Sequence, residues 1–396
     1  MSAQENRSRM DSELLLVGSI PLSTAEEVFG ACRQIAPFLG SVPDGEVGAR
    51  RFWTPYLPFM TFSRHPDLIE VHHPSWAEFL EDGRWELPTD GDFSEHWPFK
   101  IKPGVTELDL GDLHYAGPAL ESYRVFRELR DRGALPAGIA FQVGIPSTDG
   151  VVEDYFPERA DWPMAKRAYE ASAFREIERM LTEIPPEDLV VQWDLAVEPV
   201  NIEMVVNPWL SEAADSSGHK PPDGVASPSE GEDVPKTADE LFAHHMRSIN
   251  ELWRGVPEPV RLGYHWCYGT WGGWPMTELR SLDLCVRLTN AVVAGAERRV
   301  DYVHMPVIRD PDEAFFAPLE NLEVGDTRVY LGLIHHDDPD PDGLDRRLEL
   351  ARRYLKEFGI AGVCGYGRVR HTEIDAIFDS HRRGAERLRA LSAAAS

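Results

Sequence analysis

Short runs of apolar and β-branched residues alternate along the chain with longer segments in which apolar residues recur every three or four positions. The short runs predict eight strands, which lie near residues 14–21, 38–46, 138–146, 189–199, 260–269, 300–307, 328–336 and 359–367. The longer segments predict a helix that begins after Ser23 or Thr24, either of which can cap its first turn, and further helices near residues 165–183, 238–254, 278–294, 341–357 and 371–391.

Eight apolar strands that alternate with helices are typical of a parallel sheet covered by helices, and eight is the number that closes a barrel. The sequence therefore predicts an α/β protein built as a single (β/α)8 TIM barrel. A doubly wound open sheet is the alternative architecture. The segment GSIPLS after the first run lacks the glycine pattern of a dinucleotide-binding loop, so a Rossmann-type fold has no support.

Three stretches depart from this alternation. Residues 52–135 are rich in tryptophan and proline and predict an insertion that covers one end of the barrel. Residues 210–236 are polar and rich in proline, glycine and serine, which is typical of a mobile surface loop. This loop is either a lid or a solvated insertion. Residues 1–12 are polar and predict a disordered tail, which leaves 13–396 as one barrel domain.

The charge balance changes the choice of partners. The chain of 396 residues has 67 acidic side chains against 40 lysines and arginines, so its formal net charge is −27. Such a chain repels nucleic-acid phosphates and anionic lipid, so we expect neither as a partner. No apolar run approaches the ~20 residues of a membrane helix, and the N-terminus lacks the apolar core of a signal peptide. Four cysteines are too few for a disulfide scaffold. We therefore expect a cytoplasmic protein with reduced thiols.

The sharpest local motif is His265-Trp266-Cys267, near the end of the fifth predicted strand. Residues i and i+2 of a strand point to the same side, so the imidazole and the thiol face one space. Cys364 lies on the eighth predicted strand, whose end converges on the same barrel mouth. One imidazole and two thiolates with an open position fit a catalytic Zn²⁺ site. The alternative is that all three pack as ordinary buried residues.

Other polar residues follow the same strands. Glu46 comes after the second strand, and Asp194 stands inside the apolar run of the fourth, where a carboxylate is costly unless paired. Either carboxylate could hold a substrate amine or act as a general base. His304 lies on the sixth strand. Arg309 and Arg368 follow the sixth and eighth strands and could clamp a substrate carboxylate or phosphate, or form structural ion pairs.

The segments VGSIP, PDGE, FQVGIP, QWD, HWCYG, VHMPVIRD, LGLIHH and CGYGR occur in an order that resembles the zinc-carrying barrel of cobalamin-independent methionine synthase. This family belongs to a larger superfamily that includes uroporphyrinogen decarboxylase. The resemblance spans nearly the whole chain in short islands and is nearest to a single-barrel branch. It implies zinc ligands at His265, Cys267 and Cys364, and residues that hold homocysteine at Gly18, Ser19, Glu46 and Asp194.

Two departures from the family pattern bear on the chemistry. The family's fourth zinc ligand is a glutamate on the sixth strand, and Pro306 stands at about that place here. His304 or a water would then complete the site. The family's folate-binding first barrel has no counterpart in these residues, so the thiol and the alkyl donor remain open.

Three functions are compatible with these residues. The first is zinc-dependent methyl or alkyl transfer to a small thiol, with Asp194 and His304 as catalytic residues, Arg309 among the substrate-binding residues, and a methyl or alkyl donor as the second partner. The second is a metal-free decarboxylase or lyase of the uroporphyrinogen decarboxylase type. The third is a barrel that binds a small molecule without catalysis. A homodimer is compatible with each of them.

Overall fold

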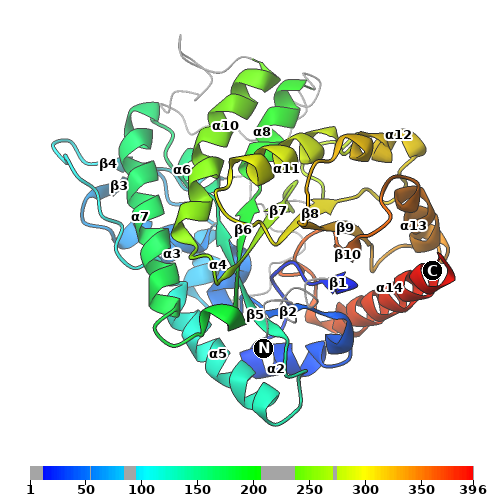
Figure 1. Ribbon diagram of the computed structural model, residues 1–396. Coiled ribbons are helices and arrows are strands. Elements are labelled where there is room, and N and C mark those ends of the chain that lie inside the picture. The colour runs from blue at the N-terminus through cyan, green and yellow to red at the C-terminus, as the bar shows by residue number, and fades with distance from the viewer. Residues whose placement is uncertain (1–11, 54, 84–94, 207–236, 271–273, 396) are drawn as a thin grey trace.

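The computed structural model describes residues 12–53, 55–83, 95–206, 237–270 and 274–395. Eight parallel strands form one sheet in the order β1-β10-β9-β8-β7-β6-β5-β2, inside a ring of helices (Figure 1). The sheet is nearly closed, because Leu14 of β1 also bridges Leu39 beside β2. The predicted (β/α)8 barrel is therefore confirmed. Its strands are β1 Leu14–Leu15, β2 Ser41–Pro43, β5 Ala140–Pro146, β6 Leu189–Leu195, β7 Arg261–Trp266, β8 Tyr302–Pro306, β9 Arg328–Ile334 and β10 Gly359–Gly362.

The strands read as nearly continuous apolar runs because both of their faces are covered. All seven residues of β6 are buried, between the barrel interior and the outer helices. The polar residues inside the barrel satisfy one another. Gln142 donates to the carbonyl oxygens of Leu16 and Val17, at 3.0 Å each, and the Tyr302 hydroxyl donates to Gln192 Oε1 at 2.8 Å. This polar layer forms the floor beneath the strand ends.

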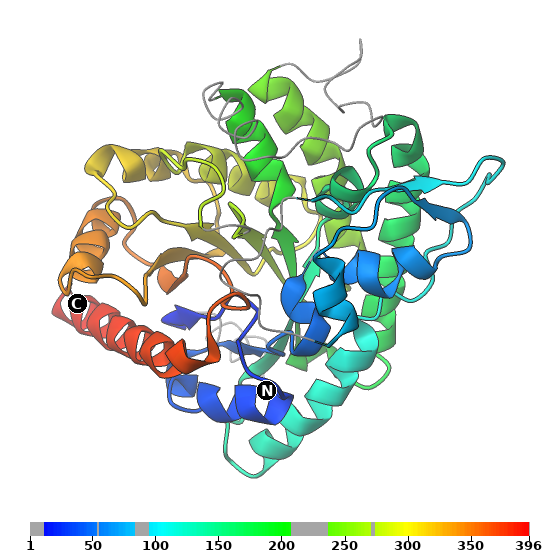
Figure 2. The same cartoon turned by 180° about the vertical axis from the view of Figure 1, so that it is seen from behind.

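Helices follow most of the strands and form the outer ring, which Figure 2 shows from behind. The first helix begins where the sequence predicts, because Thr24 and Glu27 form a reciprocal capping box. The helices are α2 Ala25–Cys32, α3 Tyr56–Met60, α4 Ala77–Glu81, α5 Ala116–Asp131, α6 Thr148–Tyr155, α7 Trp162–Met180, α8 Val197–Val206, α10 Ala238–Leu252, α11 Asp283–Gly295, α12 Glu313–Phe316, α13 Gly343–Tyr354 and α14 Ile374–Ala395.

The stretch 52–135 has two parts. Its last helix, α5, packs against α2 and α7 and so belongs to the outer ring. The preceding residues hold α3, α4 and the antiparallel pair β3 (Leu68–Glu70) and β4 (Phe99–Ile101), which projects from the body beside α7 (Figures 1 and 2). The predicted loop 210–236 and nearly all of the predicted tail 1–12 lie outside the described residues. No helix in the described part of the chain is both long enough and apolar enough to cross a membrane.

The fourth predicted strand is longer than the strand in the structure. β6 ends at Leu195, and helix α8 begins at Val197, so Glu198 and Pro199 are helical. The apolar residues continue from the strand into the helix, so the hydrophobic pattern does not mark the change. This correction matters for Glu198, which is fully buried beside α6 instead of ending a strand.

Candidate active site

A cavity of about 340 Å³ opens at the C-terminal ends of the strands. In barrels of this type the loops at that end carry the functional groups. Side chains that follow β1, β2, β6, β7 and β10 line the cavity, and so do residues of α8 and of the 52–135 stretch. The residues that the sequence singles out and that line it are Gly18, Ser19, Glu46, Asp194, His265, Cys267, Cys364 and Arg368.

Three metal-ligating side chains meet on one wall of this cavity. His265 lies in β7, Cys267 directly follows that strand, and Cys364 follows β10. The sulfur atoms of the two cysteines are 3.4 Å apart, and one ligand atom from each residue lies within 4.8 Å of the others. The Cys267 thiol and burial raise the pKa of Cys364 well above its usual range. Two thiols this close ionise readily only beside a cation.

The donor set fits a zinc ion. His265 is 2% exposed, and its Nε2 atom has no hydrogen-bond partner among the described residues. A buried nitrogen lone pair beside two thiols is the environment that Zn²⁺ favours over Mg²⁺ or Ca²⁺. The residues present therefore suit the metal that the resemblance implies.

His304 of β8 contacts His265 instead of joining the three ligands. The two residues lie opposite each other in the β7–β8 register, and their Nδ1 atoms are 2.7 Å apart. Burial and the neighbouring His265 hold the pKa of His304 well below its usual range, so its ring is neutral. One proton then lies between the two Nδ1 atoms. If His265 donates it, the Nε2 lone pair of His265 is left for a metal.

Glu46 and Asp194 form a carboxyl pair beside the three ligands, since Asp194 of β6 lies opposite His265 in the β6–β7 register. Both converge over Gly144, where a Cβ atom would lie 2.8 Å from Asp194 Oδ2 and 3.0 Å from Glu46 Oε1, so a larger residue there would displace the pair. The Ser19 hydroxyl donates to Glu46, and Gln192 Nε2 donates to Asp194 Oδ1 at 2.7 Å. Burial raises the pKa of Glu46 to about 7, and burial and Glu46 together raise the pKa of Asp194 well above its usual range. The pair therefore holds protons near neutral pH and favours a cationic ligand.

Two cavity residues have no clear sequence signal. Trp53 follows the short 3-10 helix Gly48–Phe52 and has φ 57° and ψ −103°, a conformation that a bulky residue disfavours. Its indole faces Asp194 and lowers the pKa of that carboxyl. Arg51 also lines the cavity and donates through Nη2 to the Leu22 carbonyl oxygen at 2.7 Å. The hydrophobic pattern around Trp53 and Arg51 does not distinguish them from ordinary surface residues.

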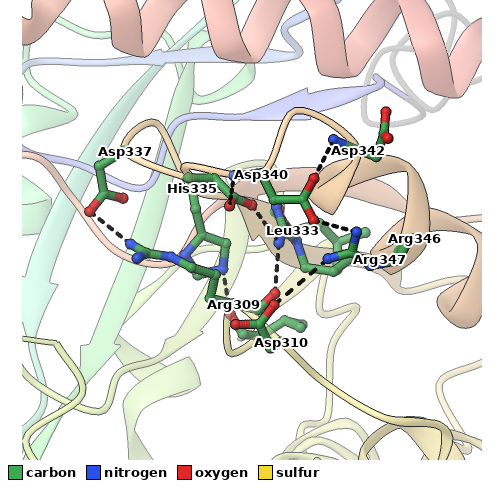
Figure 3. A network of polar contacts seen from close by, with 11 residues as sticks. Arg309, Asp310, Leu333, His335, Asp337, Asp340, Asp342, Arg346 and Arg347 are labelled. Atoms are coloured by element: carbon green, nitrogen blue, oxygen red, sulfur yellow. Dashed lines mark hydrogen bonds and ion pairs between the residues drawn. The ribbon is translucent and has the colours of Figure 1, made fainter.

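The two predicted arginines have different places. Arg368 lines the cavity, donates to the Thr270 hydroxyl and lies near the thiols of Cys267 and Cys364. Arg309 does not line it. Figure 3 shows Arg309 in a network beyond the ends of β8 and β9, where its guanidinium pairs with Asp337 at 2.7 Å. The Arg309 carbonyl oxygen accepts from Arg347 at 2.7 Å in the same network.

The comparisons with known proteins report similarity of structure only. No family model matches the chain, and no curated protein matches it. A solved structure from Listeria monocytogenes, provisionally described as a vitamin-B12-independent methionine synthase, is 16% identical with a TM-score of 0.49, over 94% of this chain and 96% of its own. A methyltransferase from Methanosarcina mazei is 11% identical with a TM-score of 0.41, over 95% and 96%. The fold assignment therefore rests on the strand order of the barrel itself.

Proposed function

We propose that this chain is a zinc-dependent transferase that moves a methyl or other alkyl group onto the thiol of a small amino-bearing substrate. One observation carries the proposal: an imidazole and two thiols meet at the barrel mouth, in the same cavity as a buried carboxyl pair. The first feature suits a soft metal and the second suits an amine. A small aminothiol would use both features in one cavity of about 340 Å³.

The chain's own residues have separable roles in this proposal. His265, Cys267 and Cys364 hold the metal, and His304 orients His265. When bound, Zn²⁺ supplies a Lewis acid that lowers the pKa of a substrate thiol. Glu46 and Asp194 bind the substrate ammonium group, which replaces the protons that the pair otherwise shares. Arg368 faces the same space and suits an acidic group on the thiol substrate or on the donor.

Metal analysis of cysteine variants tests the metal site. We expect the wild-type protein to retain its zinc in the presence of a chelator that contains no thiol group. The variants Cys267→Ser and Cys364→Ser should each lose one zinc per chain. Cys32→Ala is the matched control, because Cys32 is a fully buried cysteine in α2, away from the cavity. Equal zinc contents in the wild type and the two serine variants would contradict the proposal.

Turnover tests the reaction class. Homocysteine and other small aminothiols are incubated with a panel of methyl and alkyl donors, and thioether products are followed by mass spectrometry. We expect product with at least one pair, and loss of turnover in Cys364→Ser but not in Cys32→Ala. An amine-free thiol of the same length should react more slowly than its amino counterpart in the wild type, and this difference should shrink in Glu46→Gln.

A metal-free decarboxylase or lyase is the second candidate, and the carboxyl pair favours it. A carboxyl whose pKa is about 7 donates or accepts a proton at neutral pH, as Glu46 would. This function needs Glu46, Asp194 and Arg368 but neither cysteine. Activity that survives Cys267→Ser and disappears in Asp194→Asn would support it over the transferase.

A further inference from the structure

A second group of buried polar residues lies outside the cavity. Helices α6, α8 and α10 pack against one another, with α7 against α6, on one flank of the barrel (Figure 1). Their facing sides carry acidic, basic and imidazole side chains, none of which lines the cavity. We call this group the helix cluster, and it consists of Asp149, Glu153, Lys166, Glu170, Glu198, His244 and His245.

Four members of the helix cluster lie at metal-ligand separations. His245 Nδ1 is 2.8 Å from Asp149 Oδ2, and His244 Nε2 is 2.5 Å from Glu153 Oε1. One ligand atom from each of these four residues lies within 4.8 Å of all the others. Ligands about 2.1 Å from a common metal are separated by at most about twice that distance. The four residues are therefore close enough to surround one ion once their side chains exchange these hydrogen bonds for bonds to the metal.

The helix cluster contains more negative than positive charge. Lys166 Nζ lies 2.6 Å from Asp149 Oδ1 and 2.6 Å from Glu153 Oε1, and it is the only lysine in the cluster. Glu198 is fully buried, with the Ser147 hydroxyl nearby and no cation paired with it in the described part of the chain. Burial and Asp149 raise the pKa of Glu198 to about 7. Four carboxyl groups of the cluster thus lie near a single lysine, and a divalent ion would add positive charge beside them.

A buried nitrogen gives independent support for a ligand. His245 is fully buried, its Nδ1 is engaged by Asp149, and its Nε2 has no hydrogen-bond partner among the described residues. Buried polar atoms are almost always satisfied, so an unsatisfied imidazole nitrogen calls for an occupant.

We propose that the helix cluster is a second metal site, which takes a divalent first-row transition ion in place of the Lys166 ammonium. Asp149 and Glu153 of α6 and His244 and His245 of α10 are its ligands. Mixed nitrogen and oxygen donors suit zinc, manganese, iron or cobalt, whereas calcium and magnesium prefer oxygen alone. The ion has a structural role, because it joins α10 to α6. The Lys166 side chain is 17% exposed, so it can leave toward solvent.

Cobalt(II) can test this site separately from the cysteine site. The double variant Cys267→Ser/Cys364→Ser removes both thiols from the cavity. We expect it to bind one Co²⁺ per chain, with weak visible absorption, no thiolate-to-cobalt charge-transfer band, and a rise in the unfolding temperature. This experiment does not depend on the proposed function, because the variant lacks two of the ligands on which that function rests.

Variants in the double-serine background assign the ligands. His245→Ala and the isosteric Glu153→Gln should each weaken Co²⁺ binding at least tenfold, and Lys166→Met should tighten it by a similar factor because the competing ammonium is gone. His114→Ala is the control, since His114 is a partly exposed histidine outside the helix cluster. Absence of Co²⁺ binding in the double variant, binding that survives His245→Ala and Glu153→Gln, or no tightening in Lys166→Met would each overturn the proposal in favour of a lysine-centred ion-pair network.

Discussion

Two residues at the cavity hold backbone conformations that their side chains disfavour. Glu46 has φ 50° and Trp53 has φ 57°. Such conformations cost on the order of 1–3 kcal/mol each and persist where the surroundings enforce them. The Glu46 N–H donates to Asp44 Oδ1 at 2.9 Å, and Asp44 in turn pairs with Arg50. The local structure thus fixes the direction in which the Glu46 carboxyl points.

The strain at Trp53 predicts an unusual order of stability among its variants. Glycine adopts φ 57° and ψ −103° without a Cβ penalty, whereas alanine keeps the strain and loses the indole packing. We expect Trp53→Gly to be more stable than Trp53→Ala by about 1 kcal/mol, measured by chemical denaturation. Both variants should lose substrate binding, because the indole faces Asp194. Equal stability of the two variants would mean that the backbone is relaxed.

Glu46 predicts a pH dependence of stability with a defined sign. Its pKa is about 7 in the folded protein and 4.5 in an ordinary setting. Between these values the folded state holds a proton that the unfolded chain releases, so the free energy of unfolding falls as pH rises. We expect Glu46→Gln to remove about 3 kcal/mol of this fall. Urea denaturation from about pH 5 to pH 8, with a chelator present, measures it. An unchanged slope in the variant would contradict the assignment.

The sequence identifies part of the candidate site and misses part of it. The sequence alone reveals the i, i+2 spacing of His265 and Cys267, because strand geometry dictates which side chains share a face. It also reveals Asp194 as an isolated carboxylate in an apolar run. The place of Trp53 in the cavity cannot be predicted from the sequence, because no sequence pattern indicates its positive φ. Arg309 and Arg368 look alike in sequence, and only the loop paths bring Arg368 to the cavity and Arg309 to Asp337.

At the scale of elements, close packing inside the barrel depends on particular glycines. A Cβ atom on Gly263 of β7 would lie 2.1 Å from Tyr302 Cζ of β8. The ring therefore occupies the space above Gly263 and reaches Gln192 in the polar floor. Gly30 in α2 is different, because nothing lies within 4 Å of a Cβ atom added there.

This contact predicts opposite effects for one substitution at two glycines. Gly263→Ala should destabilise the protein by about 1–3 kcal/mol through overpacking. Gly30→Ala should stabilise it by about 0.5–1 kcal/mol, because α2 gains helix propensity. The double variant Gly263→Ala/Tyr302→Leu should lose less than the sum of its single changes. Additive losses in thermal or chemical unfolding would show that Tyr302 is not the obstacle.

The order of elements follows from the sequence more completely than their ends do. All eight strands occur where apolar runs predict them, because parallel strands buried on both faces must be apolar. The helices α5, α6 and α8 are not among the predicted helices. α5 falls in the stretch interpreted as an insertion, and α8 continues the apolar run of β6, so in both cases the pattern is ambiguous until tertiary packing decides it.

At the scale of the whole molecule, the barrel has a seam between β1 and β2. A single bridge joins Leu14 to Leu39 there, whereas β5 and β6 pair over their full length. The side chain of Gln142 takes part in closing the seam, since its Nε2 donates to the carbonyl oxygens of Leu16 and Val17. The seam is therefore held largely by side chains.

The seam predicts where the barrel opens first. We expect backbone amides in 14–17 and 39–43 to exchange with deuterium faster than those in 189–195, as followed by mass spectrometry. Gln142→Met should widen this difference, since the Leu16 carbonyl oxygen loses its Gln142 donor, and an unsatisfied buried carbonyl oxygen costs about 1–3 kcal/mol. The Val17 carbonyl oxygen keeps a second donor, Gln192 Nε2 at 2.7 Å. A variant that speeds exchange equally in all eight strands would instead indicate global destabilisation.

The hydrogen bond from Ser19 to Glu46 joins the loops on the two sides of this seam. This hydrogen bond helps to close the barrel, and its acceptor Glu46 is also part of the proposed amine site. A substrate ammonium that binds Glu46 competes with the Ser19 hydroxyl for this carboxyl, and it connects the same two loops itself. Substrate binding and closure of the barrel are then coupled. When the substrate leaves, the contact between the β1 and β2 loops weakens, and the next substrate molecule restores it.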